Sequence, residues 1–262
     1  MDACDALGVQ SAWFFLAIGF LVGPLALLIS AVQDPTILTS LKRSQRAAFA
    51  TIWKNMADPL DKRYAKYKAP FMKDISGVVL DLGSGLGQNL KYLDASKISR
   101  LLLVEPNPGM HEGLRKNALA AGFKEGQFQI VPCGAEEKAK VEQFTGLGHE
   151  SVDSVVSLLA LCGIPESKRV IAALYDYLKP GGTFYFFEHV ASKHAGARSL
   201  QDRLNPLWKF LFGGCNLNRA TDKWILESFE WAETKEMSID FENEKALDPK
   251  AYGWAKKPAR QQ

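Results

Sequence analysis

The sequence predicts an α/β fold in which a doubly wound, mainly parallel sheet is covered by helices on both faces. Three observations support this prediction: short apolar runs alternate with segments of helical spacing, a glycine-rich turn follows the first apolar run, and two alternating segments lie near the end of the chain. Continuous apolar runs between helices are typical of buried parallel strands. We therefore expect five parallel strands followed by a carboxy-terminal hairpin.

The first predicted strand runs into a glycine-rich loop. Residues 78–82 read Val-Val-Leu-Asp-Leu, and glycines follow at 83, 85 and 87. Glycine lets the backbone turn sharply and approach a ligand with no Cβ in the way. The dinucleotide pattern Gly-x-Gly-x-x-Gly would need a glycine where the chain has Gln88. The spacing therefore favours S-adenosylmethionine over NAD, with a plain strand-turn-helix unit as the alternative, and residues 88–93 have helical spacing.

The second apolar run, residues 101–105, ends in an acid 18 residues after Gly87. A carboxylate about 20 residues beyond such a loop holds the two ribose hydroxyls of a nucleotide, because it accepts a hydrogen bond from each. Glu105 is therefore the predicted ribose ligand. The alternative is a solvated glutamate at the end of a strand.

The alternation of strands and helices continues to the end of the chain. Lys-Pro-Gly-Gly at 179–182 is expected to end one helix and turn the chain into the next strand. The expected elements are a turn at 106–108, a helix at 109–121, strands at 128–131 and 151–159, a helix at 167–178, a strand at 183–188, and a pair of strands at 234–241 and 252–256.

Charge and cysteine usage exclude some classes of function. The 262 residues carry a formal charge of only +3 and no dense Lys/Arg block, so we expect no nucleic-acid partner. The four cysteines are scattered without a Cys-x-x-Cys pair, which fits a reducing compartment and argues against a zinc site or a disulfide framework. We therefore expect no metal. The cysteines are Cys4, Cys133, Cys162 and Cys215.

The amino-terminal segment predicts a membrane anchor. Residues 12–32 contain no charged side chain, and at about 1.5 Å per residue a helix of this length spans the roughly 30 Å hydrocarbon core. Acidic rather than basic residues precede the run, which argues against a cleaved signal peptide. Basic residues follow it, so the positive-inside rule places the rest of the chain in the cytosol. Gly23-Pro24 leaves a kinked helix or a hairpin open.

Residues 34–75 mix basic and aromatic side chains at three- and four-residue intervals. This spacing predicts one or two amphipathic helices broken at Pro59. Such helices could cover the sheet edge, form a lid over a pocket or lie on lipid. The expected organisation is an anchor at 1–33, a linker or lid at 34–75 and a catalytic domain at 76–258.

Over about residues 76–258 the chain resembles the class I S-adenosylmethionine-dependent methyltransferases. More narrowly, it is similar to the methyltransferase-like alkyl-thiol S-methyltransferases that an amino-terminal apolar helix anchors to endoplasmic reticulum and lipid droplets. Glu105 and Asn218 depart from that group, which usually has Asp and Thr there, and this puts the acceptor in question rather than the cofactor. The matching features are the anchor, Leu-Asp-Leu-Gly-Ser-Gly-Leu-Gly, Val-Glu-Pro-Asn-Pro, Leu-Ala-Leu-Cys-Gly, Leu-Lys-Pro-Gly-Gly, Phe-Phe-Glu-His-Val-Ala and Gly-Cys-Asn-Leu-Asn-Arg-Ala-Thr.

The resemblance implies a Rossmann-like seven-stranded sheet and S-adenosylmethionine as the cofactor. It also implies a small hydrophobic acceptor, above all a thiol, membrane lipid as a partner of the amino-terminal helix, and a location at the endoplasmic reticulum or lipid droplet. A loop after the third strand is expected to hold the adenine. The expected cofactor-binding residues are Asp81, Gly83, Ser84, Gly85, Gly87, Glu105, Pro106, Asn107, Ala135, Glu136 and Leu158.

Methyl transfer from a sulfonium is an in-line displacement that needs the nucleophile, methyl carbon and leaving sulfur collinear and about 3 Å apart. His189, just after the fifth strand, is the predicted catalytic base, and a structural histidine is the alternative. Glu188 either orients His189 or caps the sheet. Cys162 and Cys215 either line the pocket or are inert buried thiols.

Three other functions stay open on the sequence alone. The first is an O- or N-methyltransferase of a lipid, quinone or secondary metabolite. The second is a non-catalytic lipid-droplet or membrane protein that retains the fold. A nicotinamide-dependent reductase is the most distant, because of Gln88.

Overall fold

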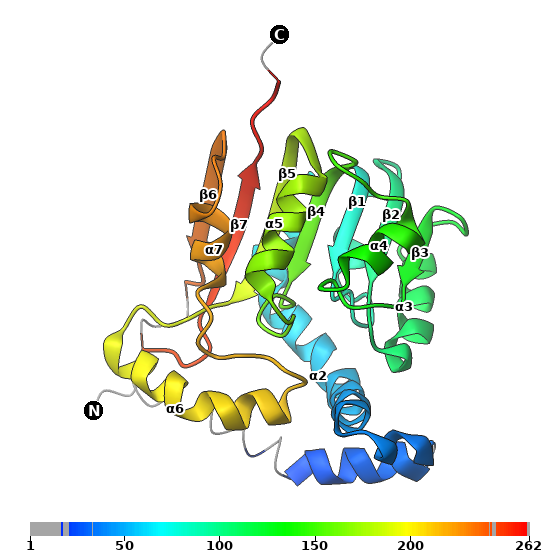
Figure 1. Ribbon diagram of the computed structural model, residues 1–262, viewed down its shortest axis with the longest axis vertical. Helices are drawn as coiled ribbons and strands as arrows, with labels where there is room; N and C mark the ends of the chain where they lie inside the picture. The colour runs from blue at the N-terminus through cyan, green and yellow to red at the C-terminus, as the bar shows by residue number, and fades with distance from the viewer. Residues whose placement is uncertain (1–16, 18–20, 33, 241, 243–244, 261–262) are drawn as a thin grey trace.

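Seven strands form one sheet at the centre of the molecule (Figure 1). The structure is a computed structural model that describes residues 17, 21–32, 34–240, 242 and 245–260. The sheet order is β3-β2-β1-β4-β5-β7-β6, in which β1 to β5 are parallel and β7 is antiparallel to β5 and β6. The strands are β1 (Gly77–Leu82), β2 (Ile98–Val104), β3 (Phe128–Val131), β4 (Val152–Leu158), β5 (Leu178–His189), β6 (Glu233–Ser238) and β7 (Lys250–Lys256).

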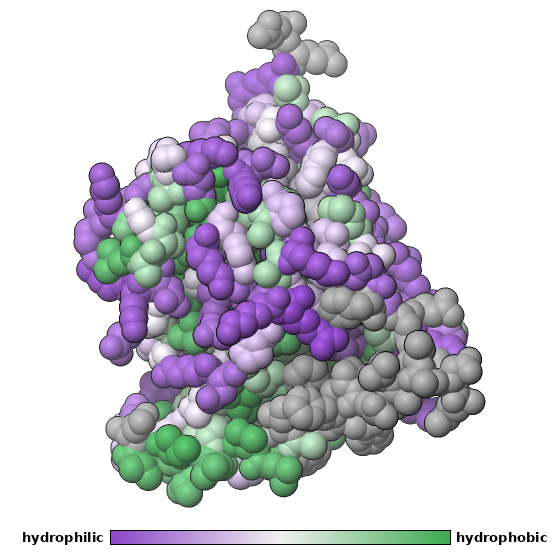
Figure 2. All heavy atoms as spheres, turned by 180° about the vertical axis from the view of Figure 1, so that it is seen from behind, coloured by the Kyte–Doolittle hydropathy of each residue, from purple (hydrophilic) through white to green (hydrophobic). Residues whose placement is uncertain are grey.

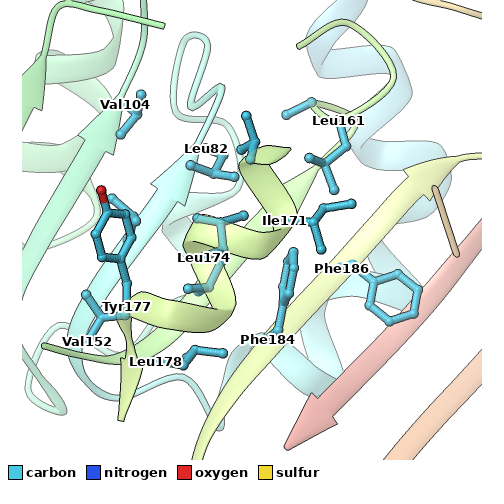
Figure 3. Close-up of a cluster of buried hydrophobic side chains, with 14 of the residues drawn as sticks. Leu82, Val104, Val152, Leu161, Ile171, Leu174, Tyr177, Leu178, Phe184 and Phe186 are labelled. Atoms are coloured by element: carbon cyan, nitrogen blue, oxygen red, sulfur yellow. The ribbon is translucent and has the colours of Figure 1, made fainter. Parts of the chain in front are cut away.

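This sheet confirms the predicted architecture of five parallel strands and a carboxy-terminal hairpin. Side chains alternate between the two faces of each strand, so neighbouring residues enter different cores. On one face, Leu82 and Phe184 pack against Ile171 and Leu174 of a covering helix (Figure 3). The helices on this face are α4 (Lys138–Thr145), α5 (Ser167–Tyr177) and α7 (Thr221–Glu227).

The other face is covered by α2 (Leu41–Met72) and α3 (Pro108–Ala120). The predicted break at Pro59 is wrong, because α2 continues through it as one helix. The second half of α2 is held against the sheet by aromatic contacts. Tyr64 lies 5.2 Å from Phe187 between ring centroids, and Phe71 stacks on Tyr185. Packing at these buried positions outweighs the hydrogen bond that a proline removes from a helix.

Two further local predictions are corrected by the structure. Instead of a helix at 88–93, only the 3-10 turn η2 (Leu90–Tyr92) forms. The chain turns directly after it, where the Asp94 carboxylate accepts hydrogen bonds from the backbone and hydroxyl of Ser96. The fifth strand is longer than predicted, because residues 178–182 join it through an irregular pairing with β4. The predicted strand at 234–241 ends at Ser238, and residue 241 lies outside the described residues.

Residues 21–32 form a helix that packs on the start of α2. Ala26 is buried, and the Ser30 hydroxyl is within hydrogen-bonding distance of the Thr51 hydroxyl. The opposite side is apolar and open to solvent, with Leu21 77% and Leu28 61% exposed. Figure 2 shows these apolar side chains gathered at the lower end of the molecule. The helix leads through η1 (Pro35–Thr39) into α2.

Part of the uncharged run predicted as the membrane anchor, namely residues 12–16 and 18–20, lies outside the described residues. Within the described part of the chain, no helix combines the length and the apolar character needed to span a bilayer.

Candidate functional site

The carboxyl ends of four neighbouring strands bring the predicted cofactor residues to one edge of the sheet. The order β3-β2-β1-β4 places the loops after these strands side by side. Open α/β sheets bind ligands at this edge, next to the point where the strand order reverses. Here the reversal falls between β1 and β4.

The glycine loop after β1 has the backbone shape that only glycine adopts easily. Gly83 and Gly85 have φ angles of 58° and 57°, in the left-handed region. A Cβ on Gly83 would lie 2.8 Å from the Cβ of Ala160, and one on Gly85 would lie 3.2 Å from the indole nitrogen of Trp53. The loop is thus closely covered on both sides. The Gly87 N–H donates to the Ser84 carbonyl, which closes the turn.

Glu105 is held in place by backbone N–H groups. Its Oε2 accepts from Gly85 at 2.8 Å and its Oε1 accepts from Asn107 at 2.8 Å. The side chain is buried, and burial raises its pKa although both hydrogen bonds oppose the rise. Each carboxylate oxygen keeps a second lone pair, so the group can still accept from two hydroxyls. Pro106 lies between Glu105 and Asn107 in the sequence. The Asn107 side chain then caps α3 by accepting a hydrogen bond from the Gly109 N–H.

Asp81 is the second buried acid of this edge. Burial, together with the charge of Glu105, raises its pKa to about 7, against the hydrogen bond from Ser84. Few hydrogen bonds offset the cost of ionising this buried carboxyl, so a nearby positive charge would stabilise its ionised form. The methionyl ammonium and the sulfonium of S-adenosylmethionine both carry that charge.

The loop after β3 contains the predicted adenine residues Ala135 and Glu136, both half-buried. It is a tight turn in which the Glu137 carboxylate accepts from the Gly134 N–H at 3.0 Å. Leu158 ends β4 and is buried on the face that α2 covers. The structure therefore gathers these residues at the same edge as Asp81 and Glu105.

A recess of about 340 Å³, including the part open to solvent, lies between α2 and this edge. Apolar side chains of α2, of the end of β4 and of β5 form part of its walls, namely Trp53, Ala57, Leu60, Leu158, Leu159 and Phe187. Polar and charged side chains form the rest, namely Asp61, Tyr64, Lys68, Gln88 and Asn89. The middle of α2, from Trp53 to Lys68, therefore covers the recess, and the end of the helix packs on the sheet through Phe71.

A buried charge network at the recess was not predicted from the sequence. Asp61 and Lys68, two turns apart on α2, form an ion pair at 2.6 Å, and Lys91 approaches the other oxygen of Asp61 at 2.7 Å. Lys68 also donates to Asn89 Oδ1 at 2.6 Å. Burial opposes ionisation of Asp61, but the hydrogen bonds from Lys68 and Lys91 hold its pKa below the usual value. The sequence signal that could have revealed this ion pair is the seven-residue spacing of Asp61 and Lys68, which places both on the same face of a helix.

Glu188 serves the β4 loop rather than His189. Its Oε1 accepts from the Ser157 hydroxyl at 2.6 Å and from the N–H groups of Ala160 and Leu161. Burial raises its pKa to about 7. No hydrogen bond joins Glu188 to His189 within the described chain, so of the two predicted roles the capping role fits and the orienting role does not.

His189 lies in a buried cluster with two thiols. Its Nδ1 is 3.6 Å from the Sγ of Cys215, and that Sγ is 3.2 Å from the Sγ of Cys162. The contact between the two sulfurs raises the pKa of Cys162 and lowers the pKa of Cys215, and His189 lowers the pKa of Cys215 further. Of the other histidines, His111 is half-buried and contacts the Glu105 carbonyl, and His194 caps α6 (Ala195–Leu211).

Known proteins show where this chain belongs. Residues 80–186 match the family described as "Methyltransferase domain". The chain is 31% identical to human thiol S-methyltransferase TMT1A over 181 residues, which cover 68% of this chain and 70% of the relative. It is 30% identical to thiol S-methyltransferase TMT1B of Rattus norvegicus over 177 residues, covering 65% of this chain and 67% of the relative.

Solved structures agree on the fold. The methyltransferase in the complex with the Haloferax volcanii Trm112 methyltransferase activator is 18% identical, with a TM-score of 0.57, and the match covers 82% of this chain and 96% of that one. The glycine cradle and the buried acids Asp81 and Glu105 fit the ribose and the positive charge of S-adenosylmethionine. The fold and site thus define a class I S-adenosylmethionine-dependent methyltransferase. Within that class, the chain belongs to the family that contains TMT1A and TMT1B.

Proposed function

We propose that this protein methylates the sulfur of a small hydrophobic thiol. The similarity to TMT1A and TMT1B carries the proposal, because both relatives are thiol S-methyltransferases. The apolar part of the recess under α2 supports a hydrophobic acceptor, since burial of apolar surface is the main source of binding energy for such a molecule.

In this proposal the chain's own groups bind and orient both reactants. The Glu105 carboxylate accepts from the ribose hydroxyls, and the ionised Asp81 attracts the positive methionyl part. Ala135 and Glu136 lie at the adenine end. When bound, S-adenosylmethionine supplies an electrophilic methyl group on a sulfonium. Holding the acceptor sulfur in line with that group provides most of the acceleration.

The acceptor also has to lose its proton, because the thiolate is the nucleophile. His189, the predicted base, is on the same face of β5 as Phe187, since side chains two apart in a strand point the same way. Phe187 lines the recess. His189 is thus two residues along β5 from a residue that lines the recess, which supports its proposed role as the base.

The test is product analysis with matched acceptors. The full chain in detergent is incubated with labelled S-adenosylmethionine and with a thiol, a phenol and an amine that carry the same hydrophobic group. We expect methyl thioether as the main product by mass spectrometry. Product from the phenol or amine alone would overturn the thiol assignment, and no product together with no cofactor binding in calorimetry would support the non-catalytic alternative.

We further propose that the protein is attached to the membrane of the endoplasmic reticulum or lipid droplet, with the catalytic domain in the cytosol. The uncharged run at 12–32 and the exposed apolar side of helix 21–32 support this proposal. Exposed Phe210 lies at the same end, because its carbonyl accepts from Gln45 at the start of α2. Retention in the membrane pellet after alkaline carbonate washing is the expected result. Complete release into the supernatant would contradict an embedded anchor.

A further inference from the structure

Cys162, His189 and Cys215 form a set of donor atoms that could hold one metal ion. The three atoms lie within 4.8 Å of one another, and two of the three residues are buried. They come from the loop after β4, the end of β5 and the loop between α6 and α7. The set therefore lies at the carboxyl edge of the sheet, where the recess also lies.

The loops that carry the two thiols are fixed against each other. The Asn216 backbone N–H and side-chain amide both donate to the Cys162 carbonyl at 2.9 Å. Arg219 donates to the carbonyls of Leu161 and Ile164 at 2.7 Å. A prearranged donor set of this kind needs little reorganisation to bind an ion.

A second observation also points to a ligand. The Nε2 of His189 is buried and has no hydrogen-bond partner among the residues that the structure describes. Buried polar atoms without partners are rare in folded proteins and indicate a missing ion, water or other ligand. The Nδ1 of His189 faces the Cys215 thiol and Nε2 has no partner among the described residues, so no oxygen or nitrogen atom of the described chain engages either ring nitrogen.

The donor distances match a zinc-class ion better than a disulfide. Tetrahedral bonds of about 2.3 Å to sulfur and about 2.05 Å to nitrogen separate sulfur from nitrogen by about 3.6 Å, and the two sulfurs by about 3.8 Å. The observed separations are 3.6 Å and 3.2 Å. The thiols must open by about 0.6 Å to bind zinc, whereas a disulfide would need them to close by more than about 1 Å and would leave His189 without a role.

We propose that Cys162, His189 and Cys215 bind a divalent zinc-class ion whose fourth position takes the sulfur of the thiol acceptor. The acceptor part of this inference rests on the proposed function. Two cysteine thiolates neutralise a divalent ion, and three protein ligands leave the open position that is typical of catalytic zinc. Leu159 connects the two regions, because it lines the recess and its carbonyl accepts from the Cys162 thiol.

The acceptor thiol releases its proton to solvent as its sulfur binds the ion, because a coordinated thiol is deprotonated. A sulfur lone pair forms the new bond to the methyl carbon. The bond between that carbon and the sulfonium breaks, and its electron pair stays on the departing sulfur as a neutral thioether. The methylated acceptor is also a neutral thioether, a weaker ligand, and dissociates. In this assignment His189 is a ligand and not a free base.

The experiment measures metal binding without the methyl transfer reaction. The full chain in detergent, kept reduced, is loaded with Zn²⁺ or Co²⁺ and dialysed. We expect about one ion per chain in the wild type and in the control Cys133→Ser, which removes a buried thiol outside the cluster. Cys162→Ser and Cys215→Ser should each weaken binding by more than about 100-fold, since losing a ligand costs more than losing a group that only orients one. His189→Gln should do the same.

Cobalt also reports on the open position. The Co²⁺ protein should show thiolate-to-metal absorption, and a hydrophobic thiol should change its visible spectrum. Equal metal content in the wild type and the Cys162→Ser/Cys215→Ser double variant would overturn the site. If cobalt binds but its visible spectrum does not change when the hydrophobic thiol is added, the proposal that the acceptor sulfur binds the metal is overturned.

The two proposals fail in different ways. Thiol methylation at full rate by metal-free protein would overturn the metal proposal and leave the proposed function intact. If the protein binds metal but methylates no thiol, the proposed function is overturned and the metal site is retained. Cofactor binding in calorimetry shows that each variant is folded. If Cys215→Ser does not fold, Cys215→Ala replaces it in the metal-binding test.

Discussion

Replacing Asp81 with Asn should stabilise the cofactor-free protein at alkaline pH and weaken its binding of the cofactor. Asp81 is buried, and burial with the nearby Glu105 charge raises its pKa from 3.8 to about 7. Each pKa unit corresponds to about 1.4 kcal/mol, so keeping the carboxylate ionised costs the fold up to about 4 kcal/mol. Asn has nearly the same shape and removes this cost.

The sign of the pH dependence follows from the direction of the shift. A carboxyl with a raised folded-state pKa contributes no penalty below the unfolded pKa, and the penalty grows as pH rises until it reaches the folded pKa. The gain in unfolding free energy from Asp81→Asn should therefore be about 1–2 kcal/mol at pH 5 and about 3–4 kcal/mol at pH 8. Urea unfolding at the two pH values measures it.

A matched control separates this effect from that of simply removing a charge. Asp58→Asn makes the same change at an exposed position of α2 and should show no such rise with pH. Equal stability of Asp81→Asn and the wild type at pH 8 would refute the reasoning, because it would show that the carboxylate is fully compensated in the fold.

The same variant should lose cofactor affinity by about 10- to 100-fold, which corresponds to one charge-assisted hydrogen bond. In the wild type at pH 6, cofactor binding should release a proton from Asp81, because a positive ligand favours the ionised form. Calorimetry in two buffers of different ionisation enthalpy detects that proton. A binding enthalpy independent of the buffer would contradict the pairing of Asp81 with the positive part of the cofactor.

Three further variants test the remaining parts of the site. Glu105→Ala should abolish methyl transfer while circular dichroism shows a retained fold, and full activity would remove the ribose assignment. His189→Ala should flatten the pH–rate profile if the imidazole acts as a base, and an unchanged profile would leave it a metal ligand or a structural residue. Trp53→Ala should raise the acceptor KM several-fold, because the indole lines the recess and covers Gly85, whereas an unchanged KM would show that α2 does not close over the acceptor.

The sheet was predictable because its signals are local. The apolar runs that became β1 to β4, and the alternating pair that became β6 and β7, are each contained in a short stretch of sequence. The glycine loop at 83–87 and the acid Glu105 at the end of a strand are likewise recognised from a few consecutive residues. The carboxyl edge of a parallel sheet then places Asp81 next to Glu105 without further information.

The errors arose where tertiary packing decides the outcome. Pro59 looked like a break, yet the aromatic residues after it hold α2 on the sheet as one helix. The spacing of the cysteines describes only local motifs, so it does not show which cysteines the fold brings together. Cys162, His189 and Cys215 are brought together by two loops and the end of β5, which no pattern in the linear sequence reveals.

The continuity of α2 has a mechanical consequence. With 32 residues it is a rod about 48 Å long. One end meets the exposed apolar helix 21–32, and Trp53 covers the recess partway along it. If a bilayer tilted the apolar end of α2, the helix would also move at Trp53, which covers the recess. Contact with lipid could therefore change the rate at which a hydrophobic thioether product is released.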